Sequence, residues 1–380
     1  MQAKSIKGRS TEQIHSALLE CMTGGFKPTI AAIFLSIKQD KQALQELMKK
    51  YDIEIFGVTS SGEFIDGNME EESTVALLMD INRSYYKISL VDVGSGDTRE
   101  KAKEIGRMGL ETFNHPAYIV CGSGVNSDGE MIIRGIEDVA GEDITIVGGM
   151  AGDDFNMLCS YVFTTDEVSD NGIVCMLVDE DKIRVHSLAI CGWQPVGTVK
   201  TITKSNGCWV YTIDNLPALD TIVKYMGISS LNRENRTDVI VQIGSNFPME
   251  VQTEDGGWVM RTAMLGNWND NSFMCAGNVP EGSKVRFTLP PEFEVIDKVI
   301  NSCKEVKETQ LPEIDAMILF ECKARHISLG PVAGQEIEGL RQVWNAPMAG
   351  YFTYGEFGRA PGKRQQFHNI TCSWVALKEK

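Results

Sequence analysis

Three short turns in the sequence combine residue types that bind small polar groups. Each turn follows an apolar run and ends in glycine followed by an acid. Glycine tolerates a positive φ and close approach to its backbone, and successive N–H groups in such a turn can hold an anion. Hydroxyls add donors and acceptors, and carboxylates can hold an amine or a guanidinium. The candidate ligand-binding residues are Thr59, Ser60, Ser61, Gly62, Glu63, Gly152, Asp153, Asp154, Gly355 and Glu356.

The same order of elements surrounds each turn. An apolar strand is followed by an amphipathic helix, a second strand, the glycine–acid turn and a further strand. The first strands are expected at 29–37, 117–124 and 316–322, and the last at 73–79, 172–178 and 370–377. A strand-helix-strand unit forms a parallel pair, and the last strand most simply returns antiparallel. The sequence predicts an α/β protein with mixed β-sheets flanked by helices, built from repeated strand-helix-strand-strand units.

Composition limits the class of protein further. The chain has 380 residues and ordinary hydrophobic content, which is enough for two or three domains. We expect two, at 1–214 and 215–380. The net charge of −16 makes nucleic acid an unfavourable partner. The N-terminus has no apolar signal core, and no apolar run is long enough for membrane insertion. Ten cysteines without a CxxC motif are typical of buried thiols in a reducing compartment, so we expect a cytoplasmic protein.

Two interpretations of the turns remain open. If the units pack about one centre, the turns converge on a pocket at the strand ends, where α/β folds bind ligands. Arg325 would then hold a carboxylate or phosphate, and Glu63 an amine, so that an amino acid would satisfy both charges. In the alternative interpretation, the acids only cap their turns, or Glu63 pairs with Arg325.

Other chemistries have weaker support in the sequence. A nucleophile elbow, a dinucleotide fingerprint, a P-loop and a zinc HExxH motif are all incomplete or missing. An enzyme would have to use Glu63 or Glu356 as acid–base and Cys322 or Ser60 as nucleophile, without a recognisable pair. A single imidazole can hold haem iron. His326, expected at a strand end beside Arg325, is the first choice of ligand, followed by His186 and His368.

The order of these motifs resembles the FIST (F-box and intracellular signal transduction) family. The resemblance rests on GVTSSGEF, VGGMAGDDF, CGWQPVG, TIDNLPALD, VMRTAMLG, FECKAR, YFTYGEFG and FHNIT, and covers residues 29–377. It implies FIST N and FIST C domains and an intracellular sensory role with a small ligand. It also implies an alternative, since a similar bacterial subset binds haem and senses nitric oxide with a histidine kinase or a cyclic-di-GMP enzyme. Either role would require a separate signalling partner and no catalysis by the chain itself.

Overall fold

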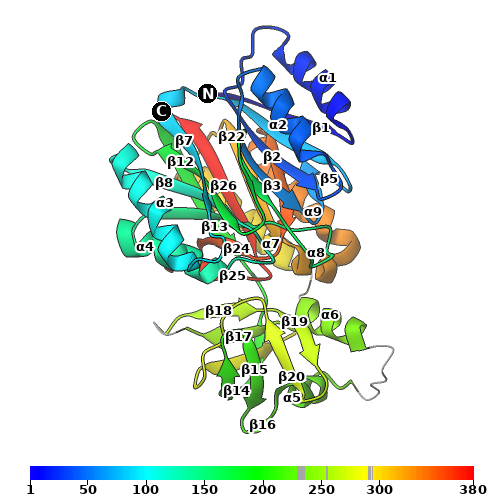
Figure 1. Cartoon of the computed structure of the whole chain (residues 1–380). Helices are drawn as coiled ribbons and strands as arrows, with labels where there is room; N and C mark the ends of the chain where they lie inside the picture. The colour runs from blue at the N-terminus through cyan, green and yellow to red at the C-terminus, as the bar shows by residue number, and fades with distance from the viewer. Residues whose placement is uncertain (229–235, 254–255, 290–291, 293) are drawn as a thin grey trace.

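The computed structural model describes residues 1–228, 236–253, 256–289, 292 and 294–380. Within these ranges, three units of the same element order build the larger lobe, seen at the top of Figure 1. Each unit runs strand, helix, strand, helix, strand, turn, strand. The first comprises β1 (Gln2–Gly8), α1 (Thr11–Met22), β2 (Ile30–Ser36), α2 (Lys41–Lys50), β3 (Glu54–Ser60) and β6 (Thr74–Asp80).

The other two units repeat this order. The second comprises β7 (Tyr86–Asp92), α3 (Thr98–Thr112), β8 (Pro116–Gly122), α4 (Gly129–Ala140), β9 (Thr145–Met150) and β12 (Gly172–Asp179). The third comprises β13 (Ile183–Ile190), α7 (Glu294–Thr309), β22 (Ala316–Cys322), α9 (Ala333–Trp344), β23 (Met348–Thr353) and β26 (Cys372–Glu379), with the short helix α8 (Lys323–Leu329) after β22. The predicted strand-helix-strand-strand repeat is confirmed, and each unit carries an additional strand and helix in front of it.

Strand pairing is the same in all three units. The two strands joined by the second helix are parallel, and the strand after the turn is antiparallel to the first of them. The leading strand pairs with that last strand, so the order in the first sheet is β1-β6-β2-β3. The sheets of the second and third units have the equivalent order. The predicted mixed α/β architecture is therefore correct.

A hairpin after each turn leaves its own unit and extends the sheet of another. The hairpin β4 (Glu63–Ile65) and β5 (Asn68–Glu70) joins β23 of the third unit. The hairpin β10 (Val162–Phe163) and β11 (Val168–Ser169) joins β3, and β24 (Glu356–Arg359) with β25 (Gln365–His368) joins β9. The three units are thus interlocked in a closed ring, and this exchange brings the three turns to one place.

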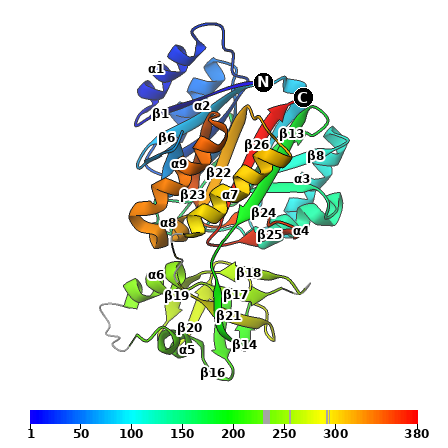
Figure 2. The same cartoon turned by 180° about the vertical axis from the view of Figure 1, so that it is seen from behind.

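The interior of the larger lobe lies between the three sheets. Residues such as Phe34, Ile119 and Phe320 from their inner faces form one apolar cluster. The helices cover the outer faces, with α1 and α2, α3 and α4, and α7 and α9 each on one sheet (Figures 1 and 2). Side-chain caps begin several of these helices, because Asp40 and Asp97 accept hydrogen bonds from backbone N–H groups at the starts of α2 and α3.

A smaller lobe is inserted in the third unit between β13 and α7, and it lies below the larger lobe in Figure 1. It has its own apolar core, which includes Val210, Phe273 and Phe287. Its described elements are β14 (Pro195–Asn206), β15 (Trp209–Ile213), β16 (Leu216–Pro217), α5 (Ala218–Tyr225), α6 (Arg236–Asn246), β17 (Met249–Gln252), β18 (Trp258–Arg261), β19 (Ala263–Asn267), β20 (Ser272–Cys275) and β21 (Lys284–Thr288). Within the described part of the chain, the helices are too short or too polar to cross a bilayer.

Candidate functional site

The three glycine–acid turns of the larger lobe meet one another. Backbone hydrogen bonds link every pair of turns: Ser61 N–H donates to the carbonyl of Phe352 (3.1 Å), Gly152 N–H to that of Thr59 (2.9 Å), and Met150 N–H to that of Gly355 (2.7 Å). Each turn also lies at a strand end, after β3, β9 or β23. The convergence arises because each turn leads into a hairpin that joins a neighbouring unit's sheet, directly after the first and third turns and through the loop at 154–161 after the second.

A different structural feature explains the glycine in each turn. Gly62 has φ of 114°, a conformation that other residues rarely adopt. A Cβ on Gly152 would lie 2.4 Å from the Ser61 hydroxyl and 2.8 Å from the Ser61 backbone nitrogen. A Cβ on Gly355 would lie 2.3 Å from the ring of Phe367. Gly152 therefore serves close contact between the second and first units, whereas Gly355 leaves room for a ring from the hairpin of its own unit.

The carboxylates of Glu63 and Glu356 occupy equivalent places and have equivalent partners. The Ser60 hydroxyl donates to Glu63, and the hydroxyl of Thr353 donates to Glu356. The second oxygen of Glu63 accepts from the Ser73 hydroxyl (2.7 Å), and that of Glu356 accepts from the backbone of Thr371 (3.2 Å). Both acids are fully buried and are satisfied within their own units.

Burial changes the ionisation of both acids. It raises the pKa of Glu63 to about 7 and the pKa of Glu356 to about 8, although the hydrogen bonds to their oxygens act in the opposite direction. The Ser60 hydroxyl and the Cys322 thiol are buried as well, and burial raises the pKa of Cys322 well above its usual range. In this structure all four side chains are enclosed by the protein.

The second turn uses its acid differently. The carboxylate of Asp153 accepts hydrogen bonds from three consecutive backbone N–H groups, those of Met157 (2.9 Å), Leu158 (2.6 Å) and Cys159 (3.0 Å), and from the hydroxyl of Tyr354. It holds a loop in which Asp154, Phe155 and Met157 all have positive φ. Asp154 is half-buried and accepts from the Ser36 hydroxyl at 2.7 Å. Asp153 therefore organises backbone, whereas Asp154 is the more accessible acid.

Arg325 lies elsewhere than the sequence suggested. Strand β22 ends at Cys322, and Arg325 and His326 lie on α8, so the expected position at a strand end is wrong. The buried guanidinium forms a bidentate pair with Glu336 (2.8 and 2.6 Å) and also donates to the carbonyl of Cys191 (2.6 Å). Its partner is not Glu63, and most of its donors are used inside the protein.

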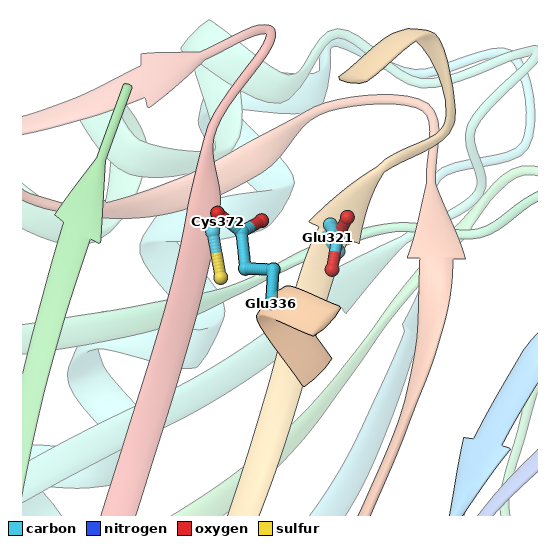
Figure 3. A group of neighbouring side chains, drawn as sticks. All are labelled: Glu321, Glu336 and Cys372. Atoms are coloured by element: carbon cyan, nitrogen blue, oxygen red, sulfur yellow. The ribbon is translucent and has the colours of Figure 1, made fainter. Parts of the chain in front are cut away.

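Sequence reasoning missed a buried cluster beside this ion pair. Figure 3 shows the side chains of Glu321 on β22, Glu336 on α9 and Cys372 on β26, whose ligand-type atoms lie within 4.8 Å of one another. Both oxygens of Glu321 lack a hydrogen-bond partner among the described residues. The acid inside the apolar run AMILFEC was the only sequence signal for it.

The donor set of this cluster is poorly suited to a metal ion. Both oxygens of Glu336 already accept from Arg325, which balances that charge. Burial and the neighbouring Glu336 raise the pKa of Glu321 well above its usual range, so a protonated Glu321 leaves the cluster neutral. The residues present therefore fit a neutral acid beside an ion pair better than a metal centre.

The three candidate haem ligands have different surroundings. His326 stacks on Phe352 with 4.1 Å between ring centroids, and its Nδ1 lies 3.3 Å from the Lys323 ammonium. Burial lowers the pKa of His326 to about 4, and that of His368 to about 4. His368 is enclosed and donates from Nε2 to the carbonyl of Gly358 at 3.1 Å. His186 on β13 has a buried Nε2 without a partner among the described atoms.

A surface pocket adjoins the meeting point of the first and third turns. Its volume is about 330 Å³, and its lining residues are Arg9, Met69, Glu70, Glu71, His326 and Phe352. Phe352 connects it directly to the first turn, because its N–H donates to the carbonyl of Gly62 at 2.9 Å. Opposite charges and an aromatic ring thus meet in one opening.

The interlocked units with an inserted lobe define a two-domain α/β protein. The chain matches the FIST N domain over residues 29–216 and the FIST C domain over residues 218–359. It therefore belongs to the FIST family, as the resemblance in the sequence implied. FIST domains are sensory, signal-transduction domains. A comparison with curated proteins finds no match.

Proposed function

We propose that the chain is a sensory module that binds a small zwitterion, such as an amino acid, beside the converged turns and signals to a separate partner protein. The observation that carries the proposal is the pocket of about 330 Å³ lined by Arg9, Glu70, Glu71, His326 and Phe352. The guanidinium of Arg9 suits a carboxylate, and the exposed carboxylate of Glu71 suits an amine.

The floor of the pocket supports recognition of a polar ligand. The Lys323 ammonium donates to Nδ1 of His326, which places the proton of the neutral imidazole on Nε2. The Nε2–H group of His326 can then donate a hydrogen bond to the ligand. Glu63 contributes to the electrostatic field around Lys323, the residue that contacts His326. The turn residues would thus act by shaping the pocket, with Asp154, Gly62 and Gly355 as supporting positions.

The link to signalling is the backbone around Phe352. Its ring lines the pocket, while its N–H and carbonyl bond the first turn. A ligand that prefers one position of this ring would shift the β4–β5 hairpin relative to β23, and a partner would read that surface. A histidine kinase or a cyclic-di-GMP enzyme is the class of partner that the family resemblance suggests.

The haem alternative meets an obstacle at His326. A metal-bound imidazole donates its other ring N–H to a carboxylate, carbonyl or water. Here the other ring nitrogen faces an ammonium group, which favours the opposite tautomer. Visible absorption of the purified protein decides this point, because a Soret band that shifts with nitric oxide would support haem sensing and contradict the zwitterion proposal.

Titration calorimetry with the common amino acids tests the proposal directly. Losing a charged hydrogen bond costs about 1.5–3 kcal/mol, so Arg9→Gln and Glu71→Gln should each weaken the best ligand by roughly 10- to 100-fold. Arg107→Gln is the matched control, because Arg107 is an exposed arginine on α3 that does not line the pocket. Equal affinity of Arg9→Gln and Arg107→Gln for that ligand would refute the site.

A further inference from the structure

A second pocket lies between the two lobes. It is about 220 Å³ in volume and is bounded by α3 and α4 of the larger lobe and by β17 and β18 of the smaller one. Figure 1 shows these strands directly beneath α4 and β25. The side chains that matter here are those of Arg99, Glu130, Arg134 and Arg261. Three guanidinium groups and one carboxylate therefore line the pocket, in a chain whose net charge is −16.

Arg261 is the unusual member of this group, because only 2% of it is exposed. Three of its hydrogen bonds go to carbonyl oxygens, those of Asn278 (3.1 Å), Met260 (3.1 Å) and Phe367 (3.0 Å). Its one carboxylate contact, with Glu130, is longer at 3.3 Å. Burial lowers the pKa of Arg261, which Glu130 only partly offsets. The structure thus holds a buried cation whose charge is poorly neutralised, and such charges are costly unless they are paired.

The neighbouring arginines leave the pocket positive. Arg134 is 3.9 Å from Glu130, at the outer limit of an ion pair, so one carboxylate is shared by two guanidiniums. Arg99 is occupied by Asp138 through two bonds of 2.8 Å. Counting this pair as neutral, the two remaining arginines and Glu130 give one net positive charge among the lining side chains, and Asp128 is a further acid whose charge acts on Arg261.

We propose that this pocket between the lobes binds a small anion that carries a phosphate or carboxylate group, held by Arg134 and Arg261. The guanidinium fork of Arg134 matches both kinds of oxyanion, whereas Arg261, whose Nε and Nη1 donate to carbonyls, contributes its charge and its remaining Nη2 N–H. A bound anion would contact the larger lobe through Arg134 on α4 and the smaller lobe through Arg261 at the end of β18. It would therefore favour the arrangement in which the lobes are closed on each other, which couples ligand concentration to the position of the inserted lobe. This site is independent of the pocket at Arg9.

Calorimetric titration of the full chain with inorganic phosphate and, separately, with succinate at matched ionic strength tests the proposal. Whichever of the two anions binds shows whether the pocket prefers a phosphate or a carboxylate group. We expect Arg134→Gln to weaken that binding by about 10- to 100-fold, as for loss of a charged hydrogen bond. Arg134 is partly exposed, so this variant should fold.

Two controls make the result decisive. Arg107→Gln removes the same charge from α3 outside the pocket, and Arg9→Gln removes it from the other proposed site; both should bind the anion as the parent does. Saturable binding lost only in Arg134→Gln supports the proposal. If neither anion binds, or if Arg134→Gln binds as tightly as Arg107→Gln, the proposal is overturned while the zwitterion site remains untouched.

Discussion

The stability of the protein is expected to fall as the pH rises from about 4.5 to about 8, because Glu63 and Glu356 ionise in buried sites. In the unfolded chain both carboxyls lose their protons near their ordinary value of 4.5, whereas in the folded protein their pKa values are about 7 and about 8. Between these values the native state binds more protons than the unfolded state. The free energy of unfolding therefore decreases with rising pH in this window and levels off above it.

The size of the effect follows from the pKa values. One pKa unit corresponds to about 1.36 kcal/mol. A rise from 4.5 to about 7 for Glu63 therefore corresponds to about 3 kcal/mol, and a rise to about 8 for Glu356 to about 5 kcal/mol. Glutamine carries no charge, and its amide oxygen can accept the hydrogen bonds made to one of the two carboxylate oxygens, whereas its NH2 group can only donate at the place of the other. Glu63→Gln and Glu356→Gln should thus be stabilising relative to the parent at high pH and not at low pH.

Urea unfolding of the parent and of both variants, followed between pH values of about 5 and 8, measures this difference. Glu111→Gln is the control, since Glu111 is exposed on α3 and should leave the pH slope unchanged. The stability difference between each buried variant and the parent should grow with pH by a few kcal/mol. If Glu63→Gln and Glu356→Gln run parallel to the parent over the whole range, burial does not govern these carboxyls and the reasoning is wrong.

Three further outcomes are expected. Arg325→Met should destabilise the protein by about 3–5 kcal/mol, because Glu336 is left buried and unpaired, and adding Glu336→Leu should restore much of this in denaturant unfolding; no recovery would argue against the pair. Gly152→Ala should cost about 1–3 kcal/mol in thermal unfolding through its contact with the Ser61 backbone, whereas Gly334→Ala on α9, with only Met69 nearby, should not. Asp153→Ala should speed proteolytic cleavage within 154–158, since the carboxylate holds three N–H groups there; an unchanged cleavage rate would contradict that role.

Much of the architecture could be predicted because local sequence patterns determine it. Apolar runs such as AMILFEC and the periodic helix between them define strand, helix and strand without any distant partner. The glycine–acid turns at 62, 152 and 355 marked the strand ends for the same reason. The leading strands and helices of the first two units were not predicted, because β1 and β7 are only partly buried and their pattern is less distinct. In the third unit the inserted lobe also separates β13 from α7.

The chemistry of the site depended on contacts between residues far apart in the chain. Sequence spacing identified Arg325 and Glu63 as charged residues worth pairing, but the fold brings α9 over β22, so Glu336 pairs with Arg325 and Glu63 is satisfied by Ser60 and Ser73. The orphaned carboxyl of Glu321 and the convergence of the turns were likewise decided in three dimensions. From its sequence alone, the chain determines which segments are strands and helices, since those follow from short-range periodicity. The partner of each buried charge was decided only by the exchange of hairpins and the packing of helices, because burial and ion pairing depend on which surfaces meet.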